Sequence, residues 1–414
     1  MKYVIYPSRL EGKIDAPPSK SYTHRALFIA SLSNQTTYIK NYNKGNDIDE
    51  SIKLLSALGA EIQVNEDNIK VKGSIDLNSD KTVMCNESGT TARFALALAS
   101  MRNGKTTIKI SDNLYNRNIE EIVNILNKNG AKASLKNNEI TIEKPFKTTE
   151  IKIDSTISSQ FVSGLLIASL LKKEEKISVQ NNVSQPYIDM TIAMLKESGA
   201  SVEANSNEYR ISGFSMSKNE YITPGDISNI LPFIVGAQLT GGEVEINNIS
   251  INEYQPERIA IEYLQKAGLN IKVYPNSIKT YWAPTIYGIE ASFKNIPDSF
   301  PTLSVLFSYS SGISIFRDIE RLKYKESNRV SETTQLLKLT NAHFKLNQNE
   351  LILYGKPKFS SIEYSSNDHR MVMAAFISSL KGKNPSTIQG DTKKSYPDFD
   401  KAMKKLNVNL TYIE

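Results

Sequence analysis

The stretch LLSALGAEIQV at residues 54–64 contains the two hydrophobic periods that decide the fold. Residues 54–58 have the spacing of an amphipathic helix, which Gly59 ends because glycine tolerates the left-handed conformation of a helix cap. Apolar and polar residues then alternate through residues 61–64 and, after a polar turn, again through residues 69–71, as they do in half-buried strands. The stretch therefore predicts a helix followed by a pair of strands.

This helix stop returns at a regular interval, with asparagine in place of glycine in the last two copies. The six stops are Gly59, Gly130, Gly199, Gly268, Asn341 and Asn407. Successive stops are 66 to 73 residues apart, and a fixed period of this kind is typical of a repeat architecture. Glycine and asparagine share the position because both tolerate the left-handed region.

A second class of helix recurs at the same period and begins with small polar residues. The six starts lie at residues 19–21, 87–91, 158–160, 225–228, 298–299 and 367–370. Each start leads into a nearly uncharged run, and a helix that is apolar on all sides must be buried on all sides. Each copy is therefore predicted to contain one interior helix, one amphipathic outer helix and several strands.

The copies divide three and three near Thr223-Pro224-Gly225, which predicts two similar domains in an α/β protein. Three copies make a unit of ordinary domain size. We expect an N-terminal domain at residues 19–224 and a C-terminal domain at residues 225–414. Residues 1–18 are expected to join the C-terminal domain, because repeat arrays often close by lending a terminal strand.

Composition excludes several classes of protein. The chain has 414 residues, 40% of them hydrophobic, and a net charge of +6, which suits anionic ligands but falls short of a nucleic-acid-binding stripe. The one cysteine, Cys85, can form no internal disulfide, and this fits a reducing cytosol. Residues 1–7 lack the apolar stretch of a signal peptide, and no run reaches the ~20 apolar residues that span a bilayer. His24, His343 and His369 are scattered, so we expect no metal.

The starts of the interior helices are candidate anion sites, because a helix N-terminus presents unpaired N–H groups and a partial positive charge. The alternative is that their small polar residues are N-caps alone. Several starts also carry cations, namely Lys20, Arg25, Arg93 and Arg370, and a buried cation is costly unless an anion compensates it. Equivalent helix starts tend to converge at one end of a repeat domain, so two facing ends would form a cleft for a ligand with two or more anionic groups.

The block Lys325-Glu326-Ser327-Asn328-Arg329 is the most informative single stretch. Lys325 and Arg329 are four residues apart and are expected to share a helix face, with Glu326 about 100° away and able to act as an acid. The alternative is an ordinary surface arrangement. Asp298 follows Pro297 at a helix start and is a candidate base, or else an N-cap.

His369 and Cys85 are two further residues with possible chemistry. His369 lies between Asp368 and Arg370, which makes it a candidate proton handler or phosphate donor, or else a satisfied capping residue. Cys85 lies at a predicted strand end and is expected to be an unreactive thiol.

Together these residues resemble the 5-enolpyruvylshikimate-3-phosphate (EPSP) synthases, a family of enolpyruvyl transferases. The resemblance covers nearly the whole chain and rests on seven motifs in order. They are Pro18-Ser19-Lys20-Ser21 with Arg25, Ser88-Gly89-Thr90 with Arg93, Asp154 with Ser158-Ser159-Gln160, Ser184-Gln185-Pro186-Tyr187-Ile188-Asp189, Ile296-Pro297-Asp298, Arg321 with Lys325-Glu326-Ser327-Asn328-Arg329, and Asn367-Asp368-His369-Arg370-Met371. Each motif is weak alone, whereas the ordered set is specific.

The resemblance implies a two-domain inside-out α/β barrel of six βαβαββ repeats, three in each domain. It also implies transfer of the enolpyruvyl group of phosphoenolpyruvate to the 5-hydroxyl of shikimate 3-phosphate, with release of phosphate through a tetrahedral intermediate. No metal or organic cofactor is implied, and the partners are the two small-molecule substrates. A cytoplasmic monomer that binds neither nucleic acid nor membrane is expected.

The resemblance also implies a role for each matching residue. Phosphoenolpyruvate is expected to contact Lys20, Gly89, Arg117, Gln160, Arg329, Arg370 and Lys394. Shikimate 3-phosphate is expected to contact Lys20, Ser21, Arg25, Ser158, Ser159, Gln160, Ser184, Tyr187, Asp298 and Lys325. Asp298 resembles the base for the 5-hydroxyl, Glu326 with Lys20 resembles the proton source for the methylene carbon, and Thr90, Arg93, Arg321, Asp368 and His369 are supporting residues.

Three single positions and one short run depart from the family pattern, and two alternatives stay open. Glu87, Phe94 and Arg321 stand where many members have Asn, Pro and Asn, and residues 227–230 differ from the usual Ser-Ser-Ala. One alternative is the sister enzyme that acts on UDP-N-acetylglucosamine, which often uses a loop cysteine as proton donor. Cys85 lies in the wrong segment for that role. The other is a non-catalytic repeat scaffold.

Overall fold

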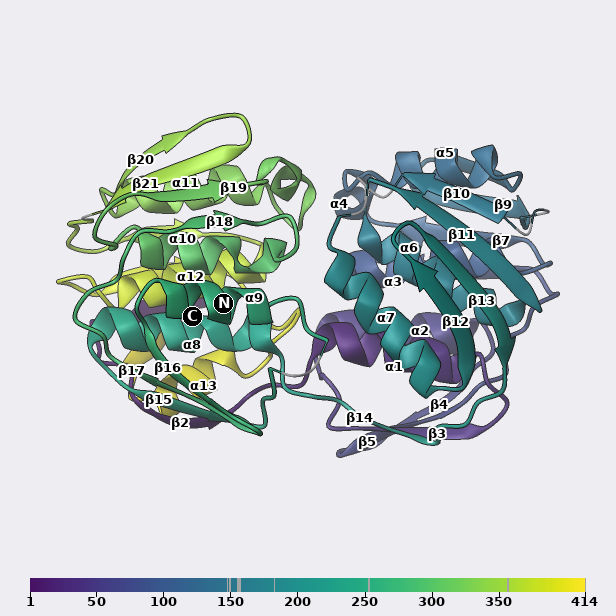
Figure 1. Cartoon of the computed structure of the whole chain (residues 1–414), viewed down its shortest axis with the longest axis horizontal. Coiled ribbons are helices and arrows are strands. Elements are labelled where there is room, and N and C mark those ends of the chain that lie inside the picture. The colour runs from purple at the N-terminus through teal and green to yellow at the C-terminus, as the bar shows by residue number, and fades with distance from the viewer. Residues whose placement is uncertain are drawn as a thin grey trace. The chain divides into compact units, whose positions relative to one another are not determined.

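The computed structural model describes residues 1–146, 148, 150–154, 158–181, 183–251, 254–355 and 357–413. The chain divides into two compact units (Figure 1). Unit 1 comprises Met1–Pro17 and Pro224–Glu414, and unit 2 comprises Pro18–Thr223. Each unit has its own hydrophobic core. The chain is thus a two-domain protein of mixed helices and sheets.

Unit 2 contains strands β3 to β14 and helices α1 to α7. Its strands are β3 (Thr36–Lys40), β4 (Glu61–Val64), β5 (Asn68–Lys72), β6 (Lys81–Cys85), β7 (Thr106–Ile110), β8 (Lys132–Lys136), β9 (Glu139–Lys144), β10 (Glu150–Asp154), β11 (Glu174–Gln180), β12 (Ala200–Asn205), β13 (Glu208–Phe214) and β14 (Glu220–Ile222). Its helices are α1 (Lys20–Ser31), α2 (Asn46–Ala57), α3 (Gly89–Ala99), α4 (Asp112–Tyr115), α5 (Ile119–Lys128), α6 (Ser159–Ala168), the 3₁₀ turn η1 (Ser169–Leu171) and α7 (Gln185–Glu197).

Unit 1 contains the remaining elements. Its strands are β1 (Lys2–Ile5), β2 (Gly12–Asp15), β15 (Val244–Asn247), β16 (Asn270–Tyr274), β17 (Ser277–Tyr281), β18 (Glu290–Ser292), β19 (Ser314–Arg317), β20 (His343–Leu346), β21 (Glu350–Gly355), β22 (Glu363–Ser365), β23 (Ser386–Gln389) and β24 (Leu410–Ile413). Its helices are α8 (Ile227–Thr240), α9 (Arg258–Lys266), η2 (Pro297–Ser299), α10 (Phe300–Phe307), η3 (Glu320–Tyr324), α11 (Arg329–Leu339), α12 (His369–Ser379) and α13 (Phe399–Lys405).

Among the described residues, the strands form six four-stranded sheets, and every sheet has the same internal order. The orders are β14-β3-β5-β4, β6-β7-β9-β8 and β10-β11-β13-β12 in unit 2, and β2-β15-β17-β16, β18-β19-β21-β20 and β22-β23-β1-β24 in unit 1. In each sheet the first pair is parallel and the other two are antiparallel. The same order and direction of strands therefore recurs in all six sheets, although β14, β2 and β1 each join a sheet whose other strands lie elsewhere in the sequence.

The first strand of the chain completes the last sheet. β1 runs antiparallel between β23 and β24, so that Tyr3 lies opposite Ile388 on one side and Tyr412 on the other. The Tyr3 ring also packs edge-on against Phe376 of α12, with ring centroids 4.9 Å apart. Residues near the two chain ends thus share one sheet and one core.

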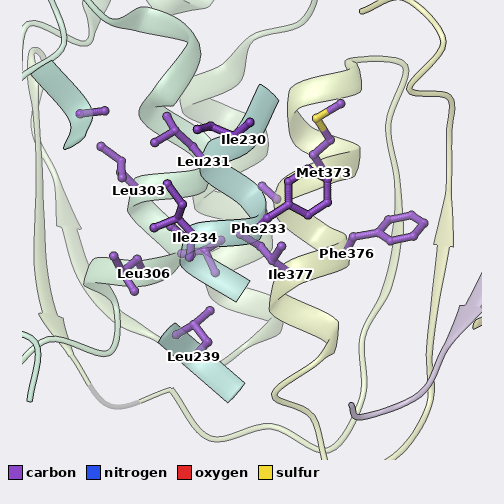
Figure 2. Close-up of a cluster of buried hydrophobic side chains, with 14 of the residues drawn as sticks. Ile230, Leu231, Phe233, Ile234, Leu239, Leu303, Leu306, Met373, Phe376 and Ile377 are labelled. Atoms are coloured by element: carbon purple, nitrogen blue, oxygen red, sulfur yellow. The ribbon is translucent and has the colours of Figure 1, made fainter. Parts of the chain in front are cut away.

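The interior helices form the centre of each unit. In unit 2, α1, α3 and α6 contact one another, and in unit 1, α8, α10 and α12 do the same. Every residue of α3, α10 and α12 is buried, as their nearly uncharged sequences predict. Figure 2 shows Ile230, Ile234, Leu303 and Ile377 from the three interior helices of unit 1 among the side chains of one cluster. The sheets lie outside these helices (Figure 1).

The predicted helix stops are confirmed at all six positions. The backbone φ angles are 113° at Gly59, 86° at Gly130, 97° at Gly199, 93° at Gly268, 53° at Asn341 and 65° at Asn407. These angles lie in the region that disfavours residues with a Cβ atom, and asparagine enters it more readily than branched residues do. The local rule that ends each outer helix is therefore visible in the sequence.

Gly130 allows this rule to be tested without a steric contribution, because a Cβ atom at Gly130 would meet nothing within 4 Å. We expect Gly130→Asn to unfold in urea close to wild type, and Gly130→Val to lose about 1–2 kcal/mol from the left-handed backbone alone. Gly59 is the control, because a Cβ there would lie 2.7 Å from the Ser74 carbonyl oxygen, so Gly59→Asn should destabilise. Equal stability of the Asn and Val variants at position 130 would contradict the rule.

Candidate functional site

The interior helices of unit 2 begin at serine caps. The side chains of Ser19, Ser88 and Ser158 accept hydrogen bonds from the backbone N–H groups of Tyr22, Thr91 and Gln160, respectively. Capping is therefore one role of these serines. The caps bring Lys20, Gly89 and Ser159 to the first position of α1, α3 and α6.

Arg25 is the most deeply buried cation of α1 and is held by neutral acceptors. Its guanidinium donates to Thr191 Oγ1 at 2.8 Å, to the Ser21 carbonyl at 2.8 Å, to Ser163 Oγ at 3.2 Å and to the Tyr187 carbonyl at 3.0 Å. Burial lowers the pKa of Arg25 to about 10. No carboxylate of the described residues pairs with Arg25, so neutral acceptors alone satisfy its guanidinium there.

Lys20 has a carboxylate partner instead. Its Nζ atom lies 2.9 Å from Oδ2 of Asp47, in the first turn of α2. The Lys20 side chain is 14% exposed and that of Asp47 is 4% exposed. The ion pair fixes the direction of the Lys20 ammonium group. Asp47 was missed in the sequence because it lies in an outer helix outside every motif.

A second group of unit 2 joins α3, α6 and the turn before α5. Arg93 donates to the Gln160 side-chain oxygen at 3.0 Å and to the Arg117 carbonyl at 2.8 Å. Gln160 in turn donates to Thr90 Oγ1 at 2.8 Å. A Cβ atom on Gly89 would lie 2.6 Å from Nη1 of Arg93 and 2.8 Å from Nη2 of Arg117. Glycine at this position therefore lets two guanidinium groups approach the start of α3.

Ser184 and Tyr187 lie at the start of α7, next to Arg25. Ser184 has a left-handed backbone with φ 52°, and the Tyr187 ring lies 5.9 Å from the Arg25 guanidinium carbon. Unit 2 therefore places Arg25, Ser184 and Tyr187 in one neighbourhood, and Gly89, Arg93, Arg117 and Gln160 in another.

Unit 1 gathers its site residues around Arg329, the first residue of α11. The guanidinium contacts Asp298 at 2.6 Å, Glu326 at 2.7 Å and Asp368 at 2.7 Å, and its side chain is 1% exposed. Burial opposes the charge, but the three carboxylates raise the pKa of Arg329 well above its usual value. Arg329 is therefore a permanent cation that fixes three acidic side chains.

The predicted helix face for Lys325 and Arg329 is wrong. Asn328 caps α11 by accepting from the Ser331 N–H, so the helix begins at Arg329 and leaves Lys325 in extended backbone. Lys325 still contacts Asp298, at 3.3 Å, and therefore reaches the same carboxylate as Arg329 by a different route. Asparagine is a strong N-cap residue, which is why the helix starts after it.

Asp298 lies in the 3₁₀ turn η2 and makes no cap bond to α10. Burial disfavours its charge, but Lys325, Arg329 and Arg370 together hold the pKa of the Asp298 carboxyl well below its usual value. Burial in turn lowers the pKa of Lys325, and Asp298 opposes that shift. Asp298 is therefore ionised at neutral pH, as a base must be.

Arg370 is the second residue of α12, and its guanidinium is held mainly by neutral groups. Its guanidinium donates to Asn229 Oδ1 at 2.8 Å and to the Ser228 hydroxyl at 2.5 Å, while Asp298 is 4.0 Å away. Asp368 caps α12 by accepting from the Arg370 N–H.

Four further residues that the sequence singled out, three of them in unit 1, also have described positions. The His369 ring is buried, with Nδ1 3.7 Å from Asp368. Arg321 lies in η3, and Lys394 is half-buried in the segment between β23 and α13. Cys85 ends β6, is fully buried and has its thiol pKa raised by burial. Cys85 is thus no loop residue that could donate a proton, and the described residues hold no cluster of metal-ligating side chains.

The predicted site residues therefore form defined groups within each unit, and a family model matches the chain that contains them. The model described as EPSP synthase (3-phosphoshikimate 1-carboxyvinyltransferase) matches residues 4–403. The chain belongs to this family.

Curated relatives agree with this assignment. The chain is 34% identical to a 3-phosphoshikimate 1-carboxyvinyltransferase of Clostridium novyi, over 97% of this chain and 96% of the relative. It is 30% identical to one of Methanococcus maripaludis, over 98% of each chain.

Solved structures show the same fold. The EPSP synthase of Acinetobacter baumannii matches with a TM-score of 0.80 and 22% identity, over 99% of this chain and 100% of that chain. The enolpyruvyl transferase NikO of Streptomyces tendae matches with a TM-score of 0.78 and 15% identity, over 99% of this chain and 98% of that chain.

The ion pairs of Asp298 predict a pH-dependent stability. Because its folded pKa is depressed, its contribution to the free energy of unfolding is present above the unfolded pKa of about 4 and is lost as pH falls through the folded pKa. We expect Asp298→Asn to destabilise the protein at pH 7, and its difference from wild type in urea unfolding to shrink below pH ~4.

The control for this measurement is Asp67→Asn, because Asp67 is exposed. Its unfolding curve should follow wild type at every pH. A constant difference between wild type and Asp298→Asn from pH 3 to pH 7 would contradict the assignment.

Proposed function

We propose that this shikimate-pathway transferase uses Asp298 and Glu326 to move the enolpyruvyl group of phosphoenolpyruvate to the 5-hydroxyl of shikimate 3-phosphate, releasing phosphate. The observation that carries the proposal is the Arg329 cluster, in which one buried guanidinium holds both carboxylates, at 2.6 Å and 2.7 Å. Addition followed by elimination needs one group that takes a proton and one that gives a proton. Asp298 and Glu326, both paired with Arg329, could supply these two groups.

Asp298 is the base in this proposal. In the free protein its pKa is held low by Lys325, Arg329 and Arg370, so it is ionised but weakly basic. A bound anion that shares these cations reduces their pull on Asp298 and raises its pKa. The substrates themselves therefore make Asp298 basic enough to accept the proton of the 5-hydroxyl.

Glu326 is the acid. Its charge raises the pKa of Asp298, so the two carboxylates are coupled, and protonation of one favours ionisation of the other. Protonated Glu326, with Lys20, would donate a proton to the methylene carbon of phosphoenolpyruvate. Ionised Asp298 would accept the proton of the 5-hydroxyl. Different protonation states of two nearby carboxylates are the usual basis of such a division of roles.

Charge on the reacting centre is stabilised by fixed cations. Addition creates a tetrahedral centre that carries both a phosphate and a carboxylate, and preorganised cations stabilise such charge better than water does. We assign phosphoenolpyruvate to Lys20, Gly89, Arg117, Gln160, Arg329, Arg370 and Lys394. We assign shikimate 3-phosphate to Lys20, Ser21, Arg25, Ser158, Ser159, Gln160, Ser184, Tyr187, Asp298 and Lys325.

The proposal also covers the cellular compartment, the oligomeric state and the domain that binds shikimate 3-phosphate. No helix among the described residues has the length and apolar character to span a bilayer. We propose a cytoplasmic monomer that needs only its two small-molecule substrates, with residues 19–224 forming the domain for shikimate 3-phosphate. The single buried thiol fits a reducing compartment.

Phosphate release with each acceptor tests the proposal. The purified chain and phosphoenolpyruvate are mixed with shikimate 3-phosphate or with UDP-N-acetylglucosamine, and inorganic phosphate is measured. We expect turnover with shikimate 3-phosphate alone. Turnover with the nucleotide sugar alone would reject the proposal, and turnover with neither would favour a non-catalytic scaffold.

Glu326→Gln separates catalysis from binding. The amide keeps the shape of the side chain but cannot donate an acid proton, so we expect turnover to fall by roughly 10²-fold or more with near-normal substrate binding. Glu320→Gln is the matched control, because Glu320 is exposed in the neighbouring turn η3 and pairs only at 4.0 Å with Lys323. Full turnover in Glu326→Gln would remove this residue from the mechanism.

A further inference from the structure

Asn229 is a fully buried amide in the first turn of α8 that no motif predicted. It lies in the run Ile227-Ser228-Asn229-Ile230, which departs from the family pattern. The Asn229 side chain is 0% exposed. A buried amide is retained in a core only where its polar atoms are satisfied, so its partners indicate its role.

The partners of Asn229 come from two other segments of unit 1. Its Oδ1 atom accepts from Nη1 of Arg370 at 2.8 Å and from the Ser395 hydroxyl at 3.3 Å, and its Nδ2 atom donates to the Ser395 carbonyl at 3.5 Å. Asn229 therefore links the start of α12 to the segment that carries Lys394, the neighbour of Ser395. Both linked cations, Arg370 and Lys394, are assigned to phosphoenolpyruvate.

The neutral character of this support matters for binding. Arg329 has its charge compensated by three carboxylates within 2.7 Å, whereas the ion pair of the Arg370 guanidinium with Asp298 is 4.0 Å long. Asn229, with the carbonyl and hydroxyl of Ser228 at 3.2 Å and 2.5 Å, fixes the Arg370 guanidinium without neutralising it. A cation held by neutral acceptors keeps its full attraction for an anionic ligand.

The reach of asparagine explains why a shorter residue would not serve. An amide has an acceptor that can bind two donors and a separate donor group, so it can join Arg370 and both polar groups of Ser395 at once. A serine hydroxyl at position 229 has one oxygen, which is closer to the backbone. A serine there would lose the hydrogen bond to at least one of the two segments.

We infer that Asn229 is a positioning residue that aims the Arg370 guanidinium and the Lys394 segment at the anionic groups of phosphoenolpyruvate. The inference rests on the proposed function. Asn229 is inferred to act through Arg370 and Ser395. No contact between Asn229 and the substrate is part of this role.

The test measures phosphate release by Asn229 variants and determines KM for phosphoenolpyruvate and KM for shikimate 3-phosphate separately. We expect Asn229→Ala to raise KM for phosphoenolpyruvate about tenfold, the size of one hydrogen bond to a charged group, and to leave KM for shikimate 3-phosphate within about twofold. Asn229→Asp keeps the shape and the accepting oxygen but adds a charge beside Arg370. It should raise KM for phosphoenolpyruvate at least as much, whereas a merely structural role predicts a wild-type KM in this isosteric variant.

Gln238→Leu is the matched control. Gln238 is also a buried amide of α8, and among the described residues its side chain bonds the Ala283 carbonyl and N–H, at 2.6 Å and 3.0 Å, rather than Arg370. We expect this variant to unfold at lower urea concentration with both KM values unchanged. An equal rise of both KM values in Asn229→Ala, or an unchanged KM for phosphoenolpyruvate, would overturn the inference.

The wild-type enzyme distinguishes failure of the inference from failure of the proposed function. Absence of turnover in wild type with shikimate 3-phosphate rejects the proposed function. In that case calorimetric binding of phosphoenolpyruvate to wild type and to Asn229→Ala still decides the role of Asn229, since equal dissociation constants would overturn it and a weaker variant would support it.

Discussion

The cost of burying guanidinium groups is the constraint on which the candidate site depends. A buried cation must be compensated by charge or by several hydrogen bonds, or the folded state loses several kcal/mol. The chain meets this constraint in two ways. Arg329 is compensated by Asp298, Glu326 and Asp368, at 2.6 to 2.7 Å, whereas Arg25 and Arg370 bond mainly to carbonyl, hydroxyl and amide groups. The first way fixes an acidic cluster, and the second satisfies a guanidinium with neutral groups.

How much the sequence could predict depends on the range of the interactions. The helix stops were predictable because a left-handed φ at Gly130 or Asn407 is a property of one residue and its neighbours. Full burial of α12 followed from its uncharged run in the same way. The helix face of Lys325 and Arg329 was predicted wrongly, because periodicity does not locate the start of a helix, and the cap bond of Asn328 does.

Long-range partners were beyond the sequence argument. The motifs identified Arg370 and Lys20, but not the residues that fix them. Asn229 and Arg370 are 141 positions apart, and Lys20 and Asp47 are 27 apart on different helices. An asparagine or an aspartate near a helix start has a sufficient local explanation as a cap or a first-turn acid, so only folding reveals that either side chain contacts a cation.

The same sheet topology also occurs in two units whose interior helices have caps of different charge. The interior helices of unit 2 begin at Ser19, Ser88 and Ser158, which cap without charge. In unit 1, α8 and α12 begin at Asp226 and Asp368. Asp368 pairs with Arg329, and Asp226 accepts from the Ser228 hydroxyl that supports Arg370. An aspartate cap can therefore pair with a nearby arginine, as Asp368 does with Arg329, whereas the serine caps of unit 2 add no charge to the surroundings of Arg25.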